Sequence, residues 1–420
     1  MRINTLLFSM AALMLYFPPS WSSAASSSSA PPVTMVNPEA SLVLTLEHAI
    51  EIGLARSPVL SAARNQAEAK RGLLDQAGLL PNPSIDLSVD DHQRATRTTT
   101  TMINIPVEIG GKRAARKRAA SLDRDISTRD IDTVRAEVRA QVVARFFEVA
   151  IAQETVRVSK DMARIAQEAY EMARKRVESG KAAPLERSRA EIEMANARIE
   201  TRSAETSLAN SITALAILLG DVTPSFSGVG VRIDDMPTRP SLDDLKAELS
   251  QSPRINAARL AVDLGKAEVD VERTKRYPDI TVGVGMARDN EMGRNRAQFG
   301  ISIPLPLFDR NQGNIYAATM QSYRAQDLLR DIEMRMTSEL LQAVSRYDLA
   351  AASAREYRDA VLPRAEEAYQ VARKGFEAGK MNYLEVLDAQ RALSQANIAY
   401  LTVLSDSFQS RSEIDRVLGR

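Results

Sequence analysis

The side chains that most often carry chemistry in proteins are scarce in this sequence, and those present are poorly spaced for it. The 420-residue chain contains no cysteine, which excludes disulfides, thiolate zinc sites, cysteine nucleophiles and acylation of an N-terminal cysteine. Its two histidines, His48 and His92, cannot form a local pair of metal ligands. Gly110-Gly111-Lys112 lacks the spacing of a phosphate-binding loop, and Gly283-x-Gly285 lacks a third glycine. We therefore expect no enzyme, no resident metal and no cofactor.

One run of basic residues needs an explanation. Lys112, Arg113, Arg116, Lys117 and Arg118 place five basic side chains within seven residues. The overall charge of the chain argues against nucleic-acid binding, because 55 Lys and Arg almost balance 54 Asp and Glu and leave a formal charge of +1. We interpret the run as a contact with phospholipid headgroups of the inner leaflet, with a solvated helix face as the alternative.

The amino terminus has the pattern of an export signal. Arg2 precedes an apolar run from Leu6 to Phe17, a Pro-Pro pair ends the run, and small residues follow at Ser22–Ala25. The pattern predicts a secretory signal peptide over residues 1–25, because about 12 apolar residues are too few to span a bilayer. The Ser/Ala/Pro-rich stretch after it, residues 26–40, is predicted to be flexible.

The rest of the chain consists of two similar halves. The segment from Ala166 to Lys181 returns as Ala365 to Lys380, with ten of sixteen positions identical. Other matches keep the same order at a spacing of 195–199 residues, among them Ser57-Pro58 with Ser252-Pro253 and Pro83 with Pro278. Ordered matches indicate a duplicated unit, which we place at residues 41–220 and 241–420 with a linker at 221–240.

Each half predicts a helix, two strands and a pair of long helices. No Gly or Pro occurs from Lys112 to Ser179, which predicts a helix on the order of 100 Å long at about 1.5 Å per residue. Gly180 and Gly379 are expected to end the first helix of each pair and to reverse the chain. Thr45 and Ser241 are expected helix N-caps.

The two helical hairpins are expected to differ at one position. Pro363 lies within the second hairpin, where the first has Arg164. A proline inside a helix lacks an N–H donor and clashes with the preceding turn. We therefore predict a bend in the second hairpin only.

Four short segments alternate between apolar and polar residues, at Ile85–Val89, Ile103–Val107, Ile280–Met286 and Phe299–Leu305. A period of two predicts strands with one apolar and one polar face, in β-hairpins near residues 84–107 and 279–305. If the apolar face meets lipid, an open four-stranded sheet leaves two unpaired edges, so several chains must close one barrel. Three chains would supply twelve strands and two would supply eight. The alternative is a soluble sheet packed on a helix.

Several motifs occur together in a way that is specific to one family. They are the duplicated halves, Leu44-Thr-Leu-Glu-His-Ala-Ile50 followed by Ser57-Pro58, and Tyr383-Leu-Glu-Val-Leu-Asp-Ala-Gln390 after a glycine turn. Over essentially the whole mature chain, they resemble the outer-membrane efflux proteins of the TolC type. Ile105–Ala114 and Ile303–Gly313 resemble, more narrowly, the CzcC branch, which serves heavy-metal exporters.

This resemblance implies a mainly α fold with a small β part. Four transmembrane β-strands per chain would close a twelve-stranded barrel in the bacterial outer membrane as a homotrimer, and very long antiparallel helical hairpins would continue it as an α-barrel through the periplasm. Residues around 221–250 would add to a belt at mid-height. Some members carry an acylated N-terminal cysteine, which this chain lacks, so the barrel alone would anchor it.

The resemblance also implies a function and partners. The protein would be the outer-membrane exit channel of a tripartite efflux system, passively conducting metal cations or drugs, with a periplasmic adaptor and an inner-membrane resistance-nodulation-division transporter and without nucleic acid. Gly180-Lys181 and Gly379-Lys380 would be the tips where the adaptor docks. A soluble periplasmic coiled-coil scaffold is the alternative function.

The periplasmic gate of this family carries a ring of carboxylates on the second hairpin. The positions that match this motif are Glu385 and Asp388. Three copies of each around a narrow axis would attract cations and disfavour ionisation. In the first hairpin Arg189 occupies the position of Asp388, and Arg187 lies beside it. We hypothesise that Arg187 or Arg189 pairs with Glu385 or Asp388 in the closed state.

Overall fold

The computed structural model describes residues 43–420 apart from 232 and 234–237. The expected signal peptide (1–25) and the segment 26–40 lie outside the described residues, as does part of the linker expected at 221–240.

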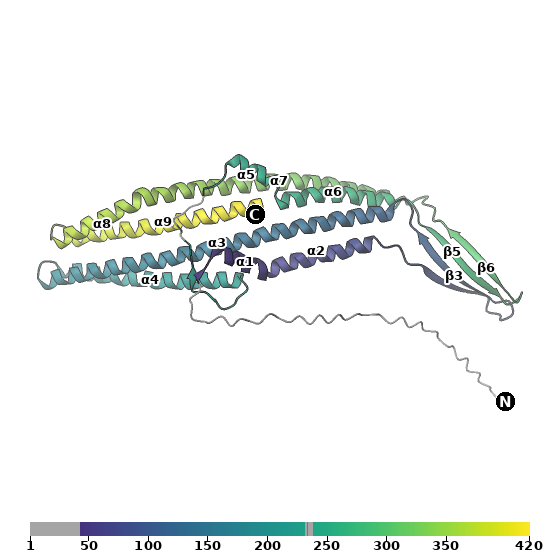
Figure 1. Cartoon of the computed structure of the whole chain (residues 1–420), viewed down its shortest axis with the longest axis horizontal. Coiled ribbons are helices and arrows are strands. Elements are labelled where there is room, and N and C mark those ends of the chain that lie inside the picture. Colours follow the sequence, from purple (N-terminus) through teal and green to yellow (C-terminus); the bar gives the residue numbers. More distant parts are fainter. Residues whose placement is uncertain (1–42, 232, 234–237) are drawn as a thin grey trace, which may run out of the picture. The chain divides into compact units, whose positions relative to one another are not determined.

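The two halves contain the same order of elements. The first comprises α1 (Leu46–Arg56), α2 (Pro58–Ala77), β2 (Ser84–Asp90), β3 (Thr98–Val107), α3 (Lys112–Glu178) and α4 (Pro184–Leu218) (Figure 1). The second comprises α5 (Leu242–Leu249), α6 (Pro253–Thr274), β5 (Ile280–Asp289), β6 (Arg294–Ser302), α7 (Gln312–Glu356), the π-helix η1 (Tyr357–Val361), α8 (Leu362–Glu377) and α9 (Tyr383–Leu418). The expectation of a mainly α fold with a small β part is confirmed.

The helix boundaries follow the sequence signals closely. Helix α3 is 67 residues long, because no Gly or Pro interrupts it. The side chain of Thr45 accepts a hydrogen bond from the His48 N–H at 3.4 Å, and that of Ser241 accepts one from the Asp244 N–H at 3.2 Å. Both expected N-caps are therefore confirmed.

The second hairpin, where a bend is predicted, contains a π-helix just before Pro363. The five residues of η1 separate α7 from α8 and end two positions before Pro363. The proline has no N–H for the usual helical bond, and the wider π turn accommodates this loss. The first hairpin has no such break at Arg164, where α3 continues.

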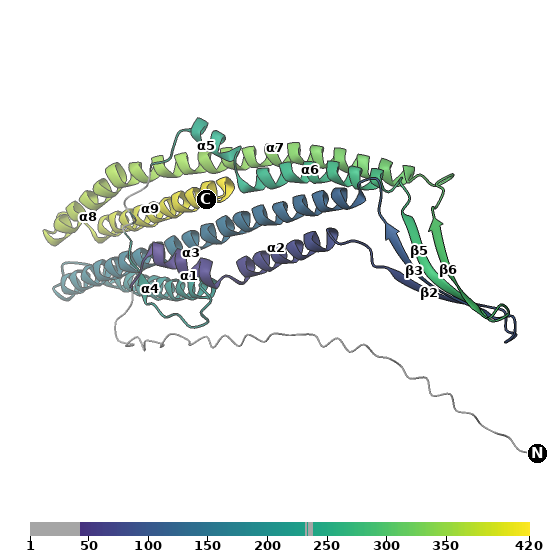
Figure 2. The same ribbon diagram turned by 45° about the vertical axis from the view of Figure 1, so that its right-hand side comes forward.

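The helices pack around α3. On one side α3 contacts α2 and α4, and on the other it contacts α6 and α9. Helix α7 then packs on α6 and α9, and α8 packs on α9 (Figures 1 and 2). The order across the layer is therefore α2 and α4, then α3, then α6 and α9, then α7 and α8, which leaves the first and last pairs as edges.

Two apolar cores hold this layer together. The larger core joins α3, α4 and α9 around Phe146 and Leu404, and the rings of Phe147 and Phe408 stack with their centroids 3.9 Å apart. The smaller core joins α5, α6, α7 and α9 around Leu245, Leu340 and Ile414.

The linker region is attached to the same layer by a short parallel pairing. β1 (Val43–Leu44) pairs with β4 (Gly228–Val229). The side chain of Gln153 on α3 accepts from the Val229 N–H at 2.8 Å and donates to the Val229 carbonyl at 3.3 Å. These bonds attach the described part of the linker to the middle of α3.

The other four strands form one antiparallel sheet in the order β2-β3-β5-β6. The register places Ile85 opposite Ile103, Ile103 opposite Val284, and Val284 opposite Phe299, so the apolar residues share one face. One expectation was wrong: β6 ends at Ser302, so Ile303 and Leu305 lie beyond the strand. Pro304 and Pro306 lack the N–H groups that would continue the ladder.

The apolar face of this sheet is uncovered in the single chain. Ile85 is 73 % exposed and Phe299 is 81 % exposed. On the opposite face Ala287 is 1 % exposed and Asp289 is 6 % exposed. The sheet therefore leaves its apolar side chains facing outward, where polar ones are usual. None of the described helices is both long and apolar enough to cross a membrane.

Candidate functional site

The two hairpin tips are built alike around a left-handed glycine. Gly180 has a φ of 69° and Gly379 a φ of 74°. At each tip the residue after the glycine donates its N–H to a carbonyl five residues back, from Lys181 to Arg176 and from Lys380 to Gly375, both at 2.8 Å. This arrangement ends a helix and reverses the chain. All four expected docking residues, Gly180, Lys181, Gly379 and Lys380, are exposed.

The expected gate acids lie just above the second tip. The backbone N–H of Glu385 donates to the side chain of Asn382 at 3.1 Å, and the Glu385 carboxylate accepts from the Asn382 N–H at 2.7 Å. This reciprocal pair is a capping box, which fixes the start of α9. Asp388 is exposed one turn further along.

The expected basic partners of these acids, Arg187 and Arg189, are exposed on α4. Among the described residues, neither arginine forms an ion pair with Glu385 or Asp388. The structure does not bring the four expected gate residues together within one chain. A pairing between neighbouring chains stays a hypothesis.

A different set of contacts joins the two hairpins, and the sequence did not predict it. The Arg176 guanidinium lies 4.3 Å from the centre of the Phe376 ring and donates to the Phe376 carbonyl at 2.9 Å. The Phe376 and Tyr383 rings meet edge to face at 6.0 Å. Arg391 pairs with Glu193 across α9 and α4 at 2.9 Å. We call these five residues the tip network.

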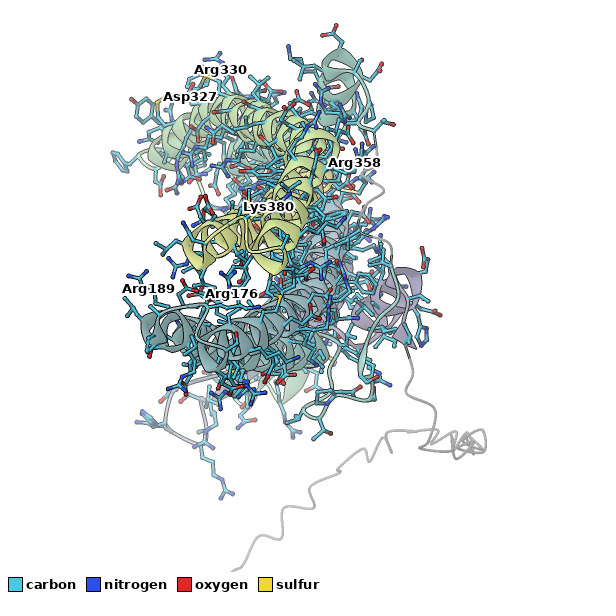
Figure 3. All side chains as sticks on the ribbon, turned by 90° about the vertical axis from the view of Figure 1, so that its left-hand side faces the viewer. Arg176, Arg189, Asp327, Arg330, Arg358 and Lys380 are labelled. Carbon is cyan, nitrogen blue, oxygen red and sulfur yellow. The ribbon has the colours of Figure 1, made fainter. Side chains whose placement is uncertain are left out.

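The tip network fastens the second hairpin onto the first. Figure 3 looks onto the tips and shows Arg176 between the two hairpins, whereas Arg189 lies at the outer side. Tyr383 is 2 % exposed, and this burial, reinforced by the negative charge of Glu193, raises the pKa of Tyr383 to about 12. The phenol therefore stays neutral at physiological pH, and the only charges of the network are on Arg176, Glu193 and Arg391.

Most of the basic run has partners inside the chain. Lys112 pairs with Asp279 at 2.7 Å, Arg113 donates to the Gly78 carbonyl at 2.5 Å, and Arg116 pairs with Glu108. These contacts join the start of α3 to the segments that enter and leave the sheet. Lys117 and Arg118 are exposed and form no ion pair within the described residues. The headgroup interpretation is therefore restricted to these two side chains.

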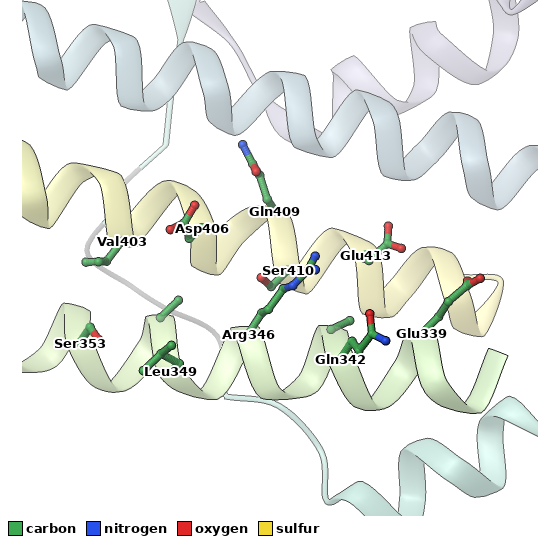
Figure 4. Close-up of a pocket in the computed structure, with 12 residues that line it drawn as sticks. Glu339, Gln342, Arg346, Leu349, Ser353, Val403, Asp406, Gln409, Ser410 and Glu413 are labelled. Carbon is green, nitrogen blue, oxygen red and sulfur yellow. The ribbon is translucent and has the colours of Figure 1, made fainter. Parts of the chain in front are cut away.

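A groove of about 650 Å³ lies between α7 and α9 (Figure 4). Its lining includes Arg346 as well as Glu339, Asp406 and Glu413. A hydrogen bond from Arg416 holds the pKa of Glu413 below its usual value, so this carboxylate is charged and already compensated. Among the described residues, no three His, Asp or Glu side chains lie close enough together to hold a metal ion.

The fold is that of solved outer-membrane channels. The chain superposes on the outer membrane protein VceC from Vibrio cholerae with a TM-score of 0.75 and 20 % identity, covering 89 % of this chain and 96 % of VceC. It superposes on CusC with a TM-score of 0.77 and 19 % identity, covering 89 % of this chain and 91 % of CusC. At these identities the likeness shows the fold alone.

Sequence similarity establishes the family. Residues 49–221 and 245–420 match the family described as outer membrane efflux protein. The chain is 41 % identical to the cobalt-zinc-cadmium resistance protein CzcC of Cupriavidus metallidurans over 382 residues, which is 91 % of each protein. The chain therefore belongs to the outer membrane efflux protein family, and the expected place in the outer membrane is confirmed.

Proposed function

We propose that three copies of this chain form the exit channel of a tripartite efflux system for heavy-metal cations. Each copy contributes β2, β3, β5 and β6 to a twelve-stranded barrel in the outer membrane, and its helices to an α-barrel in the periplasm. Substrate crosses passively down its gradient, and the energy comes from an inner-membrane resistance-nodulation-division transporter. A periplasmic adaptor joins that transporter to the channel.

The observation that carries this proposal is the uncovered apolar face of the sheet. Leu87 and Ile301 on this face are also mostly exposed, and a water-facing surface of this kind is strongly unfavourable at about 25 cal/mol per Å². Lipid removes that cost. The edge strands β2 and β6 then need partners, since an unpaired strand edge is not tolerated in the hydrocarbon core, and neighbouring copies supply them.

The helical layer supports the same assembly. Leu185, Ile192 and Ile199 are exposed on α4 at intervals of seven residues, which is the spacing of a coiled-coil seam. At the same tip end, the opposite edge exposes Val371 on α8. Two apolar edges on opposite sides of one layer favour head-to-tail association, and a rotation that closes gives a ring.

The class of substrate rests on similarity to CzcC, whose name refers to cobalt, zinc and cadmium resistance. A channel that releases its cargo needs no tight site for it. We also propose that the exposed tips at Gly180-Lys181 and Gly379-Lys380 receive the adaptor, that Glu385 and Asp388 line the periplasmic gate with Arg187 and Arg189, and that Lys117 and Arg118 contact headgroups.

The proposal is tested by expressing the full chain in a Gram-negative host and fractionating the membranes. We expect heat-modifiable trimers in detergent extracts of the outer membrane, which conduct in planar bilayers. Leu87→Arg should reduce insertion, since a charge on the lipid face near the membrane centre costs about 2–4 kcal/mol. Ser88→Arg, on the polar face of the same strand, is the matched control and should insert.

A soluble periplasmic protein, with Leu87→Arg inserting no less than Ser88→Arg, would overturn the channel and favour a coiled-coil scaffold.

The adaptor role is tested on the same preparation. Gly180→Val and Gly379→Val introduce a side chain at a positive φ, so the tips should distort, and cross-linking to the adaptor should disappear while the trimers persist. Retained cross-linking would exclude the tips as the docking point.

A further inference from the structure

The polar face of the sheet has a residue pattern that the proposed function does not use. Residues directly opposite one another in an antiparallel pair lie on the same face. The register therefore gives four successive rows: Ser84, Asn104, Gly283 and Gly300; then Asp86, Met102, Gly285 and Gln298; then Ser88, Thr100, Ala287 and Arg296; then Asp90, Thr98, Asp289 and Arg294. In the proposed barrel this face lines the lumen, and we call it the lumen face.

Glycines on the second hairpin leave room for side chains from the first. A Cβ on Gly283 would lie 2.6 Å from both the Asn104 Oδ1 and the Met102 Cε, and a Cβ on Gly285 would lie 2.7 Å from the Met102 Cγ. Asn104 and Met102 therefore lie flat across β5 rather than projecting into the lumen. A larger residue at Gly283 would push these side chains inward, and one at Gly285 would also clash with the backbone carbonyl of Thr101.

Within the first three rows Asp86 is the one acidic residue, and no ion pair joins it to a basic side chain among the described residues; Asp90 in the fourth row, nearer the loop, is likewise without one. The Asn104 amide Nδ2 donates to the Asp86 Oδ2, which orients the carboxylate but leaves its charge in place. Arg296, in the third row, is paired with Asp289 closer to the loop. Asp86 itself is exposed, so water and ions can reach it.

The duplication shows that this charge occurs once in each chain. Pro83-x-Ile85 in the first half corresponds to Pro278-x-Ile280 in the second, so the position equivalent to Asp86 is Thr281. Three chains therefore place three carboxylates at one level of the lumen, and the strands between them present glycine, methionine and glutamine at that level.

We propose that Asp86 determines the cation selectivity of the β-barrel. This inference rests on the proposed function, because it requires the lumen face to line a water-filled trimeric channel. A ring of like charges raises the local concentration of counter-ions and repels ions of the same sign. Since each carboxylate is solvated and separate from the next, the ring favours the passage of cations without holding them.

The absence of cysteine from the chain allows a test with a single reactive thiol. Asp86→Cys trimers are measured in planar bilayers under a KCl gradient, before and after treatment with an anionic and a cationic methanethiosulfonate reagent. We expect the substitution to lower the K⁺/Cl⁻ permeability ratio about threefold, as three screened charges at channel distances imply. The anionic adduct should restore the ratio, and the cationic adduct should lower it further.

Two control positions on the same strand make the result specific. Leu87→Cys lies on the apolar face, so neither reagent should change its current. Ser88→Cys lies on the lumen face and is neutral, so its permeability ratio should match the wild type until the reagents add charge. Asp86→Asn keeps an oxygen to accept from Asn104 and should show the same loss as Asp86→Cys.

The outcomes separate this inference from the proposed function. If the wild type forms no conducting trimers, the proposed function fails. If the wild type conducts and Ser88→Cys responds to the reagents, but Asp86→Cys and Asp86→Asn keep the wild-type permeability ratio, only the assignment of Asp86 is overturned.

Discussion

The two repeats of this chain fold alike but are fastened differently at their tips. Both tips turn at a left-handed glycine with the same backbone hydrogen bonds. In the first repeat the residues before and after the turn are Val177, which is half-buried, and Ala183, which provides no side-chain cap. The equivalent residues of the second repeat are Phe376, which is fully buried, and Asn382, which forms the capping box.

The two repeats share one feature of the tip and differ in several others. The glycine turn is common to both, because a left-handed backbone conformation is needed to reverse the chain there. The first repeat provides an unbroken α3 and the polar side chains of β2 and β3. The second provides the π-helix η1, the glycines Gly283 and Gly285 of β5, and the two aromatic residues of the tip network. The second hairpin is thus interrupted by a π-helix, and its tip packs against an uninterrupted first hairpin.

The largest predicted effect is at the fastening itself. Phe376→Ala removes a buried ring from between Arg176 and Tyr383, and such a truncation costs about 3–5 kcal/mol. Val177→Ala, at the equivalent position of the first repeat, should cost roughly 1 kcal/mol because the side chain is only half-buried. Hydrogen exchange measures both, in the amides of α8 and the first turns of α9 for Phe376→Ala and in those at the end of α3 and the first turns of α4 for Val177→Ala. Equal losses of protection would show that the two tips are fastened alike.

The next predicted effect concerns the π-helix before Pro363, which the first hairpin lacks. Arg164→Pro places a proline inside the continuous α3 and should cost about 3 kcal/mol or more. Arg164→Ala is the control, because it removes only exposed ion pairs along the same helix, with Glu168 at 2.8 Å and with Asp161 at 3.8 Å, each of which contributes about 0.2–0.5 kcal/mol. Pro363→Ala should do the reverse in the second hairpin and increase protection around η1.

Amide exchange along α3 and η1 reports these changes in the same experiment. If Arg164→Pro lowers amide protection no more than Arg164→Ala, the first hairpin tolerates a helix interruption as well as the second does. The contrast between the two hairpins would then have no energetic basis.

Local sequence signals predicted the elements well because each acts over a few residues. The absence of Gly and Pro defined α3, a period of two defined the strands, and Gly180 and Gly379 defined the tips. The end of β6 was missed because apolar alternation continues through Ile303 and Leu305, while Pro304 removes a backbone donor. The backbone thus overrode the pattern of side chains.

Contacts between the hairpins could not be predicted in the same way. Arg391 and Glu193 are 198 residues apart, and their pairing depends on how α9 packs beside α4. The intrachain partners of the basic run were missed for a related reason. Lys112 and Arg116 look like a charged helix face in sequence, but the sheet brings Asp279 and Glu108 next to them.

The smallest predicted effect is at the residues proposed to line the gate, where the repeats differ in charge. Asp388 in the second hairpin is replaced by Arg189 in the first, and Glu385 by Glu186. Glu385→Gln with Asp388→Asn removes the negative charges while the glutamine keeps the capping box with Asn382. Because Glu385, Asp388 and Arg189 are exposed and screened, we expect a modest rise in single-channel conductance as the closed state loses the hypothesised ion pairs.

Substitutions in the first hairpin test the same contacts from the other side. If Arg187 and Arg189 are the partners of the two acids across neighbouring copies, Arg187→Gln with Arg189→Gln should raise the conductance by the same factor, and combining all four substitutions should add nothing further. Glu186→Gln is the matched control and should leave conductance unchanged. A rise with the acid variants alone would assign the gate to the second hairpin by itself, and no rise with either would remove these four residues from the gate.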